Sequence, residues 1–219
     1  MKSRLPLNFS GRSAVSFLSF NLGWWACALG ANYGYPWLGP ALLPLWVGVH
    51  LALSPTPCGE LLFFILLAGI GFVVDSAFIK LELFTVADTT AWAPLWLVSM
   101  WILMGLTYES ILSWRRYTWL LLLSGAVTGP LTYVWCEAVE LLTYARPVWL
   151  AVGVHGLIWG ALTPLLFRVR DFSLIWALRA VKVAPRMAEL EELPQPPAVE
   201  LDWLEPADRH RDATPPTLH

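Results

Sequence analysis

The chain has 219 residues, of which 57% are hydrophobic and only 14% carry a charge, and its formal net charge is −2. Soluble domains have about 25% charged residues, so this low charge content, together with apolar runs of about twenty residues, predicts a protein with several membrane spans. The basic residues flank apolar segments and do not form an interleaved groove, which excludes a nucleic-acid-binding surface.

A short basic leader, residues 1–13, precedes the first apolar run at 14–33. This run has some features of a secretory signal peptide, because the small residues from Ala26 to Ala28 imitate a cleavage site. Asn21, Trp24 and Trp25, however, interrupt the plain apolar stretch that such a peptide needs. We therefore predict an uncleaved first transmembrane helix.

The second and third apolar runs cover residues 36–53 and 60–79. Pro36, Pro40 and Pro44 recur in the first half of the second run. Proline removes a helix hydrogen bond, so we expect that half to be kinked or irregular. The third run is long and apolar enough to cross a bilayer, and it carries one carboxylate, Asp75, near its far end.

Three further spans are predicted at residues 92–113, 117–136 and 147–167. Since only residues 114–116 separate the fourth span from the fifth, these two must form an antiparallel hairpin. The sequence therefore predicts an all-α fold, a bundle of six transmembrane helices with short loops that occupies residues 14–168.

The distribution of Lys and Arg predicts the orientation of this bundle, because positive residues gather on the cytoplasmic side of a membrane. With six spans, one side receives ten basic residues and the other side two, Lys80 and Arg146. The ten are Lys2, Arg4, Arg12, Arg115, Arg116, Arg168, Arg170, Arg179, Lys182 and Arg186. We therefore expect both termini in the cytoplasm, and a multi-pass protein of the bacterial inner membrane.

The chain changes character after the sixth span. Residues 169–186 place apolar side chains opposite Arg179, Lys182 and Arg186, which is typical of an amphipathic cytoplasmic segment. Either an interfacial helix on the membrane surface or a plain extension of the sixth span fits this pattern. Residues 187–219 are acidic and rich in proline, and they lack the apolar content of a core, so we predict a disordered tail.

Six polar residues inside the predicted spans or at their ends are candidates for an intramembrane site. A charged group in the bilayer costs at least about 2.5 kcal/mol, so such groups face the bundle and find partners. Counting residues along each span predicts an outer set and an inner set. The outer set is Asp75, His155 and Glu137, with Lys80 nearby, and the inner set is Asn21, His50 and Glu109.

Two interpretations of the outer set remain open. Asp75 and His155 could form a proton-exchanging or substrate-binding pair, because a histidine beside a carboxylate titrates near neutral pH. Alternatively, the same two residues only fix helix packing through hydrogen bonds.

No catalytic motif, nucleotide loop or metal-ligand spacing accompanies them, and Cys27, Cys58 and Cys136 lack the spacing of a zinc site or redox pair. We therefore expect no cofactor, and an enzyme is the less favoured class.

Small residues support close packing of the predicted spans. Gly125 and Gly129 form one GxxxG sequence in the fifth span, and Gly156 and Gly160 form another in the sixth. Such faces let helices approach closely. They indicate contacts within the bundle, or with a protein partner or a second copy of the chain.

Several short sequences resemble the bacterial family grouped as domain of unknown function 2878. They are Phe20-Asn21-Leu22-Gly23-Trp24, residues 27–31 and 36–40, Val74-Asp75-Ser76, Ala93-Pro94-Leu95-Trp96 and Gly129-Pro130-Leu131. The resemblance covers residues 16–167 and omits the tail. It implies a small inner-membrane protein without an assigned activity, whose relatives accompany lipid-modifying enzymes. The family pattern has Asn-His-Ser late in the fourth span, where this chain has Tyr108-Glu109-Ser110.

Two functions are therefore expected from the sequence. One is a transporter-like or lipid-handling protein that binds a lipid or a small amphipathic ligand between its helices. The other is a structural or accessory subunit whose polar groups only lock helices, and whose cytoplasmic tail recruits a partner.

Overall fold

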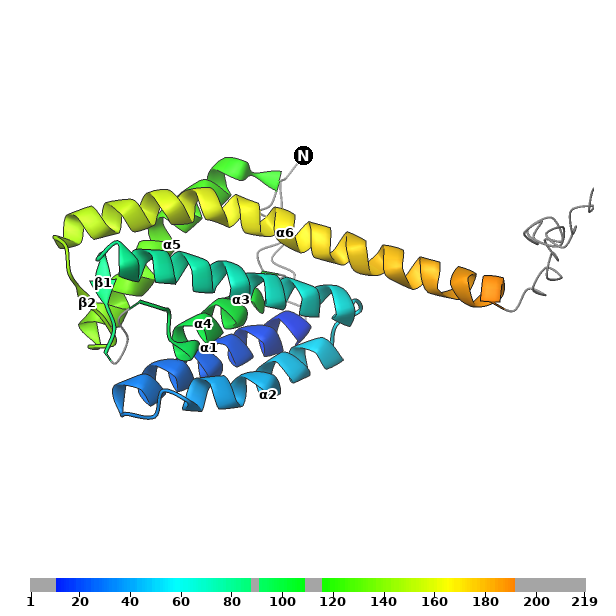
Figure 1. The fold of residues 1–219 in the computed structure, drawn as a ribbon, viewed down its shortest axis with the longest axis horizontal. Helices are drawn as coiled ribbons and strands as arrows, with labels where there is room; N and C mark the ends of the chain where they lie inside the picture. Colours follow the sequence, from blue (N-terminus) through cyan, green and yellow to red (C-terminus); the bar gives the residue numbers. More distant parts are fainter. Residues whose placement is uncertain (1–10, 88–90, 109–115, 192–219) are drawn as a thin grey trace, which may run out of the picture. The chain divides into compact units, whose positions relative to one another are not determined.

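The computed structural model describes residues 11–87, 91–108 and 116–191, with side chains up to residue 180. Six helices account for most of these residues: α1 (Gly11–Asn32), α2 (Leu38–Ala52), α3 (Pro57–Lys80), α4 (Leu95–Gly105), α5 (Thr118–Ala138) and α6 (Val148–Glu191) (Figure 1). Two short strands, β1 (Phe84–Thr85) and β2 (Thr143–Tyr144), pair antiparallel. The predicted all-helical class is confirmed.

Four helices are long and apolar enough to cross a membrane: α1, α3, α5 and the part of α6 from Val148 to Ala180. Helix α2 has 15 residues and α4 has 11, which correspond to lengths of about 22 Å and about 17 Å at 1.5 Å per residue. Both are shorter than the roughly 30 Å hydrocarbon layer. Helix length alone therefore identifies four spans.

Helix α3 contacts each of the other five helices. It packs directly on α2 and α4. In its first turn, Glu60 pairs with Arg12 of α1 and Arg170 of α6, and four turns further along Asp75 accepts a hydrogen bond from Tyr133 of α5. The third predicted span is thus the helix on which the polar contacts of the bundle converge.

The glycines of α5 and α6 lie where these two helices approach each other. A Cβ atom at Gly125 would collide with Thr163, and one at Gly129 would collide with the ring of Trp159. On α6, a Cβ at Gly160 would lie 3.3 Å from the backbone oxygen of Leu122. Both GxxxG faces are therefore used for packing within the chain.

Helix α6 continues without a break through the predicted amphipathic segment. Arg170, Ser173 and Ala177 are buried along one face of this segment, and Leu174 packs against Gly59 near the start of α3. Residues 1–181 and 182–219 form separate compact units, and the described part of the second is the helical backbone of 182–191. The rest of the predicted tail, 192–219, and most of the leader, 1–10, lie outside the described residues.

Candidate functional site

Two carboxylates of α3 are buried inside the bundle. Asp75 is fully buried and Glu60 is 2% exposed. They lie four helical turns apart, each among polar side chains from other helices. Because a buried carboxylate must find hydrogen-bond partners, the side chains around each one define two candidate sites.

Asp75 accepts hydrogen bonds from two neutral donors. The indole Nε1 of Trp101 donates to Oδ2 over 2.7 Å, and the hydroxyl of Tyr133 donates to Oδ1 over 2.5 Å. Gly71, one turn before Asp75, makes room for this arrangement, because a Cβ there would collide with the Trp101 ring. Among the described residues, no cation forms an ion pair with Asp75. Both carboxylate oxygens are thus held by aromatic side chains.

His155 lies in an aromatic box beside this carboxylate. Its ring stacks on Tyr133 with a centroid distance of 4.3 Å and an angle of 7°, and Phe78 meets it edge-on at 4.5 Å. Phe84 of β1 and Tyr144 of β2 complete the box. Neither ring nitrogen has a hydrogen-bond partner in the described part of the chain, although the Ala151 carbonyl lies near the ring.

The structure therefore brings the predicted pair together through Tyr133. This tyrosine donates to Asp75 with its hydroxyl and presents its ring to His155. The paired strands β1 and β2 supply two walls of the aromatic box around His155. Whether Asp75 and His155 act on a ligand stays a prediction.

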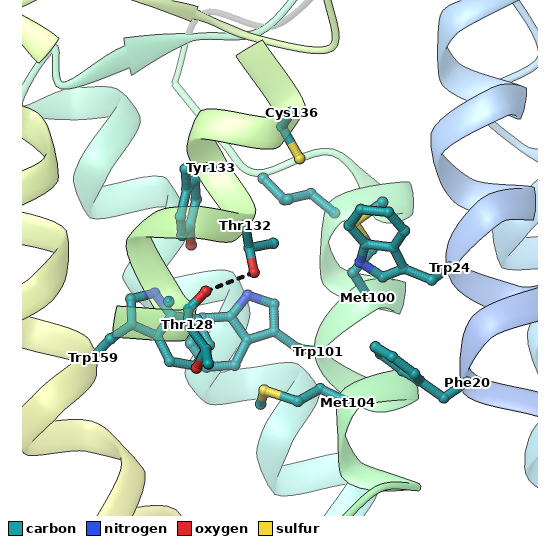
Figure 2. Close-up of a pocket in the computed structure, with 12 residues that line it drawn as sticks. Phe20, Trp24, Met100, Trp101, Met104, Thr128, Thr132, Tyr133, Cys136 and Trp159 are labelled. Carbon is teal, nitrogen blue, oxygen red and sulfur yellow. Dashed lines mark hydrogen bonds between the residues drawn. The ribbon is translucent and has the colours of Figure 1, made fainter. Parts of the chain in front are cut away.

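A cavity of about 100 Å³ lies next to the Asp75 network (Figure 2). Both donors to Asp75, Trp101 and Tyr133, line it, and Trp101 stacks on Trp159 with centroids 4.6 Å apart. The remaining lining residues are mostly apolar and come from α1, α4 and α5: Phe20, Trp24, Leu97, Met100, Met104, Thr128, Gly129, Thr132 and Cys136. A largely apolar cavity with a few polar groups is the usual form of a small-molecule site.

The cavity reaches the outer surface of the bundle between α1 and α5. Thr128 and Thr132 of α5 line it and are also exposed. Trp135, further along α5, contacts Trp24 and Trp25 of α1 at centroid distances of 4.3 Å and 5.3 Å, and so bridges the two helices beside the opening. The exposed edge of the cavity thus lies along the middle of α5, one of the four helices long enough to cross a membrane.

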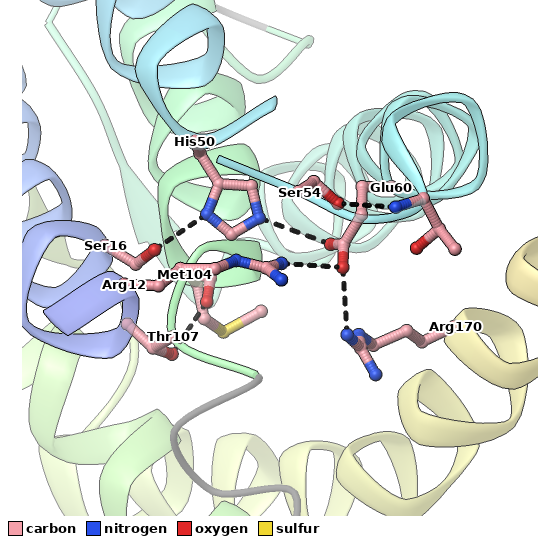
Figure 3. Close-up of polar contacts among 9 residues, drawn as sticks. Arg12, Ser16, His50, Ser54, Glu60, Met104, Thr107 and Arg170 are labelled. Carbon is pink, nitrogen blue, oxygen red and sulfur yellow. Dashed lines mark hydrogen bonds and ion pairs between the residues drawn. The ribbon is translucent and has the colours of Figure 1, made fainter. Parts of the chain in front are cut away.

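Glu60 has charged partners, in contrast to Asp75 (Figure 3). Its Oε1 lies 3.0 Å from Nη2 of Arg170 and 3.4 Å from Nη2 of Arg12. Its Oε2 lies 3.3 Å from Nε2 of His50. One carboxylate thus ties α1, α2 and α6 to the first turn of α3.

His50 extends this cluster to Ser16 of α1. The Ser16 hydroxyl and Nδ1 of His50 are 2.8 Å apart. Because an ionised carboxylate only accepts hydrogen bonds, Nε2 of His50 carries the proton that faces Glu60, and Nδ1 is the ring nitrogen that meets Ser16. His50 is 1% exposed, so the cluster excludes solvent on this side.

In the described part of the chain, Asn21, Glu137 and Lys80 contact neither of the two buried carboxylates. Asn21 donates to the Phe17 carbonyl of its own helix over 2.7 Å. Glu137 accepts from the Tyr144 backbone N–H over 3.3 Å. Burial, reinforced by the Glu137 carboxylate, raises the pKa of the Tyr144 hydroxyl to about 12, so it stays neutral. Glu109 lies outside the described residues. Lys80 places its ammonium 3.7 Å from the Trp92 ring.

Several site residues escaped the sequence analysis. Arg12 and Arg170 were counted there only as basic flanks, and Glu60 only as the start of a span. Trp101 and Tyr133 carry no signal that separates them from other membrane aromatics. The one available hint was Gly71, whose position one turn before Asp75 indicates that a bulky neighbour approaches there.

Comparison with known proteins identifies a family without an assigned function. The family model described as "Protein of unknown function (DUF2878)" matches residues 13–165. No curated protein and no solved structure matches the chain significantly. No group of three or more His, Cys, Asp or Glu side chains that could hold a metal occurs in the described ranges. The family match covers well over half of the sequence and includes both buried carboxylates, and the chain therefore belongs to the DUF2878 family.

Proposed function

We propose that this protein is an integral membrane protein that binds a lipid or another small amphipathic molecule in the cavity beside Asp75. The observation that carries the proposal is the cavity itself, which is lined by aromatic and methionine side chains and opens on the lipid-facing surface at Thr128 and Thr132. Methionine and aromatic side chains adapt to flexible apolar ligands. We assign no reaction to the site.

We further propose six membrane crossings, with both termini in the cytoplasm of a bacterial cell. The ten-to-two bias of Lys and Arg supports this orientation. Contacts support a crossing by α2: His50, near its end, meets Ser16 near the start of α1 and Glu60 near the start of α3. Helix α2 therefore returns to the level at which α1 began. A reporter fused to the C-terminus tests this topology, and a periplasmic signal would contradict it.

Lipid analysis of the purified protein tests the binding proposal. We expect wild-type protein, extracted with its surrounding lipid, to carry a molecule enriched over the bulk membrane. Thr132→Trp should remove that molecule, because the indole fills the cavity mouth. Leu131→Trp is the matched control, since Leu131 is 58% exposed on the same helix and does not line the cavity. Equal profiles for wild type and Thr132→Trp would refute the proposal.

A structural or accessory subunit is the second candidate, and the hydrogen bonding of Asp75 favours it. Both carboxylate oxygens are satisfied within the protein, and Asp75 itself does not line the cavity. Under this alternative the polar clusters only lock helices. The protein would then carry no enriched molecule, and neither tryptophan substitution would change its lipid content.

A further inference from the structure

We propose that the cavity selects an uncharged ligand, and that the hydrocarbon chain of this ligand enters sideways from the bilayer between α1 and α5. This inference rests on the proposed function and specifies its ligand class. An anionic amphiphile is excluded from the cavity, and a chain that carries a neutral hydroxyl group is accepted.

The charges around the cavity support an uncharged ligand. No Lys, Arg or His occurs among the residues that line it. Two lining residues, Trp101 and Tyr133, donate hydrogen bonds to Asp75, so its negative carboxylate lies directly behind the wall of the cavity. The arginines that contact Glu60 belong to the other cluster. An anion in the cavity would therefore be desolvated without a compensating cation.

The hydrogen-bond donors of the cavity lead to the same conclusion. Trp101 and Tyr133 already donate to Asp75. Thr128 and Thr132 donate to carbonyls one turn earlier in α5, over 2.8 Å and 2.9 Å. Their hydroxyl oxygens keep lone pairs that can accept a hydrogen bond. The site therefore offers acceptors to a ligand hydroxyl and few donors to an anion.

The indole N–H of Trp159 also belongs to the wall, but it is buried and faces the Tyr133 hydroxyl, so it is not free to donate to a ligand. A ligand hydroxyl can still donate its proton to the lone pairs of Thr132. An alcohol therefore satisfies the acceptors that the cavity offers.

The size and opening of the cavity indicate how the ligand lies. An engineered apolar cavity of about 150 Å³ in another protein binds benzene, so a cavity of about 100 Å³ holds a short segment of chain and not a whole lipid. The rest of the molecule must extend through the opening marked by Thr128 and Thr132. In Figure 2 these two threonines lie on the α5 side of the cavity, with Phe20 and Trp24 of α1 facing them.

Competition for photolabelling tests this selectivity. The probe is a long-chain alcohol with a diazirine in its alkyl chain, added to wild-type protein in nanodiscs, and labelled residues are mapped by peptide mass spectrometry. The competitors are the unlabelled alcohol and the alkyl sulfonate of equal chain length, which is anionic at every accessible pH. Because a sulfonate in the cavity loses its hydration without gaining a cation, we expect it to need on the order of tenfold higher concentration than the alcohol to displace the label.

Each outcome separates this inference from the proposed function. Label on Met100, Met104 or Thr132 that the alcohol displaces at about tenfold lower concentration than the sulfonate supports the inference. Thr132→Trp should abolish that label while Leu131→Trp keeps it. Equal displacement by alcohol and sulfonate overturns the selectivity but leaves the binding proposal intact. Label confined to lipid-facing residues outside the cavity overturns both. In Thr132→Arg, which adds a cation at the opening, the sulfonate should compete as well as the alcohol or better.

Discussion

Glu60 and Asp75 are buried on the same helix, yet one is surrounded by cations and the other by neutral aromatic donors. Glu60 lies in the first turn of α3, where Arg12 of α1 and Arg170 of α6 reach it. Asp75 lies fifteen residues further along α3, where Trp101 and Tyr133 supply the hydrogen bonds. An ion-paired cluster holds helices together, whereas a carboxylate held by two neutral side chains also shapes the cavity that those side chains line.

This difference follows from where each carboxylate lies along the helix. Arginines flank the ends of membrane spans, so a carboxylate near a helix end meets them without burying a cation in mid-membrane. Asp75 lies five residues from the other end of α3, on the side that receives only Lys80 and Arg146, and there indole and phenol groups donate hydrogen bonds without a charge. We therefore expect substitutions at the Glu60 cluster to affect stability, and substitutions at the Asp75 network to affect ligand binding more than stability.

The largest expected effect is the loss of stability in Glu60→Gln. It removes the carboxylate with which Arg12 and Arg170 pair, and breaking a buried ion pair costs about 3–5 kcal/mol. Unfolding in detergent, followed by circular dichroism during denaturant titration, measures this loss. Glu82→Gln is the control: its pair with Arg146 is exposed, so the expected cost is about 0–1 kcal/mol. Similar costs for the two variants would contradict the assigned role of the cluster.

Asp75→Asn should be less costly. Asparagine keeps one carbonyl acceptor at this position, so either Trp101 or Tyr133 loses its partner, for a cost of about 1–3 kcal/mol. The same unfolding titration measures it. A loss as large as that of Glu60→Gln would show that the Asp75 network also acts mainly as a helix lock.

Gly71→Ala tests the room that α3 leaves for Trp101. The added methyl group collides with the indole and moves it away from Asp75, for an expected overpacking cost of about 1–3 kcal/mol. The matched control is Gly69→Ala in the same helix, where a Cβ meets no atom within 4 Å. This control should gain about 0.5–1 kcal/mol from the better helix propensity of alanine. Equal stabilities of the two variants would show that the Trp101 contact is not tight.

His155→Phe should have the smallest effect. The imidazole nitrogens lack hydrogen-bond partners in the described structure, and the surrounding box is aromatic. A ring of similar volume should therefore cost less than about 1.5 kcal/mol. A larger loss, measured by the same titration, would mean that a ring nitrogen makes an important polar contact, and the alternative of a titrating histidine would gain support.

Much of the fold could be predicted from the sequence because membrane spans are long and apolar. Runs near 14–33, 60–79, 117–136 and 147–167 correspond to the four helices of spanning length. The helix at Leu95–Gly105 is much shorter than the predicted span at 92–113, since Pro94 sets its start and residues 106–108 form turns. Residues 109–115 lie outside the described structure.

The candidate site could be predicted only in part. Asp75, His155 and His50 stand out because ionisable residues are rare in spans. The sequence does not show which aromatic or basic side chains surround them, because that depends on how helices distant in the chain pack. Arg170 lies 110 positions after Glu60 and Tyr133 lies 58 after Asp75. No periodicity within a single span encodes such contacts.

The central claim is that the Asp75 network shapes a ligand site while the Glu60 cluster holds the helices. The most direct test compares the molecules bound to the folded fraction of wild type, Asp75→Asn and Glu60→Gln after identical extraction with surrounding lipid. The account predicts that Asp75→Asn loses most of the enriched molecule although the protein remains folded. It also predicts that folded Glu60→Gln retains the molecule at the wild-type level. Equal occupancy in all three proteins, or loss in Glu60→Gln alone, would contradict the account.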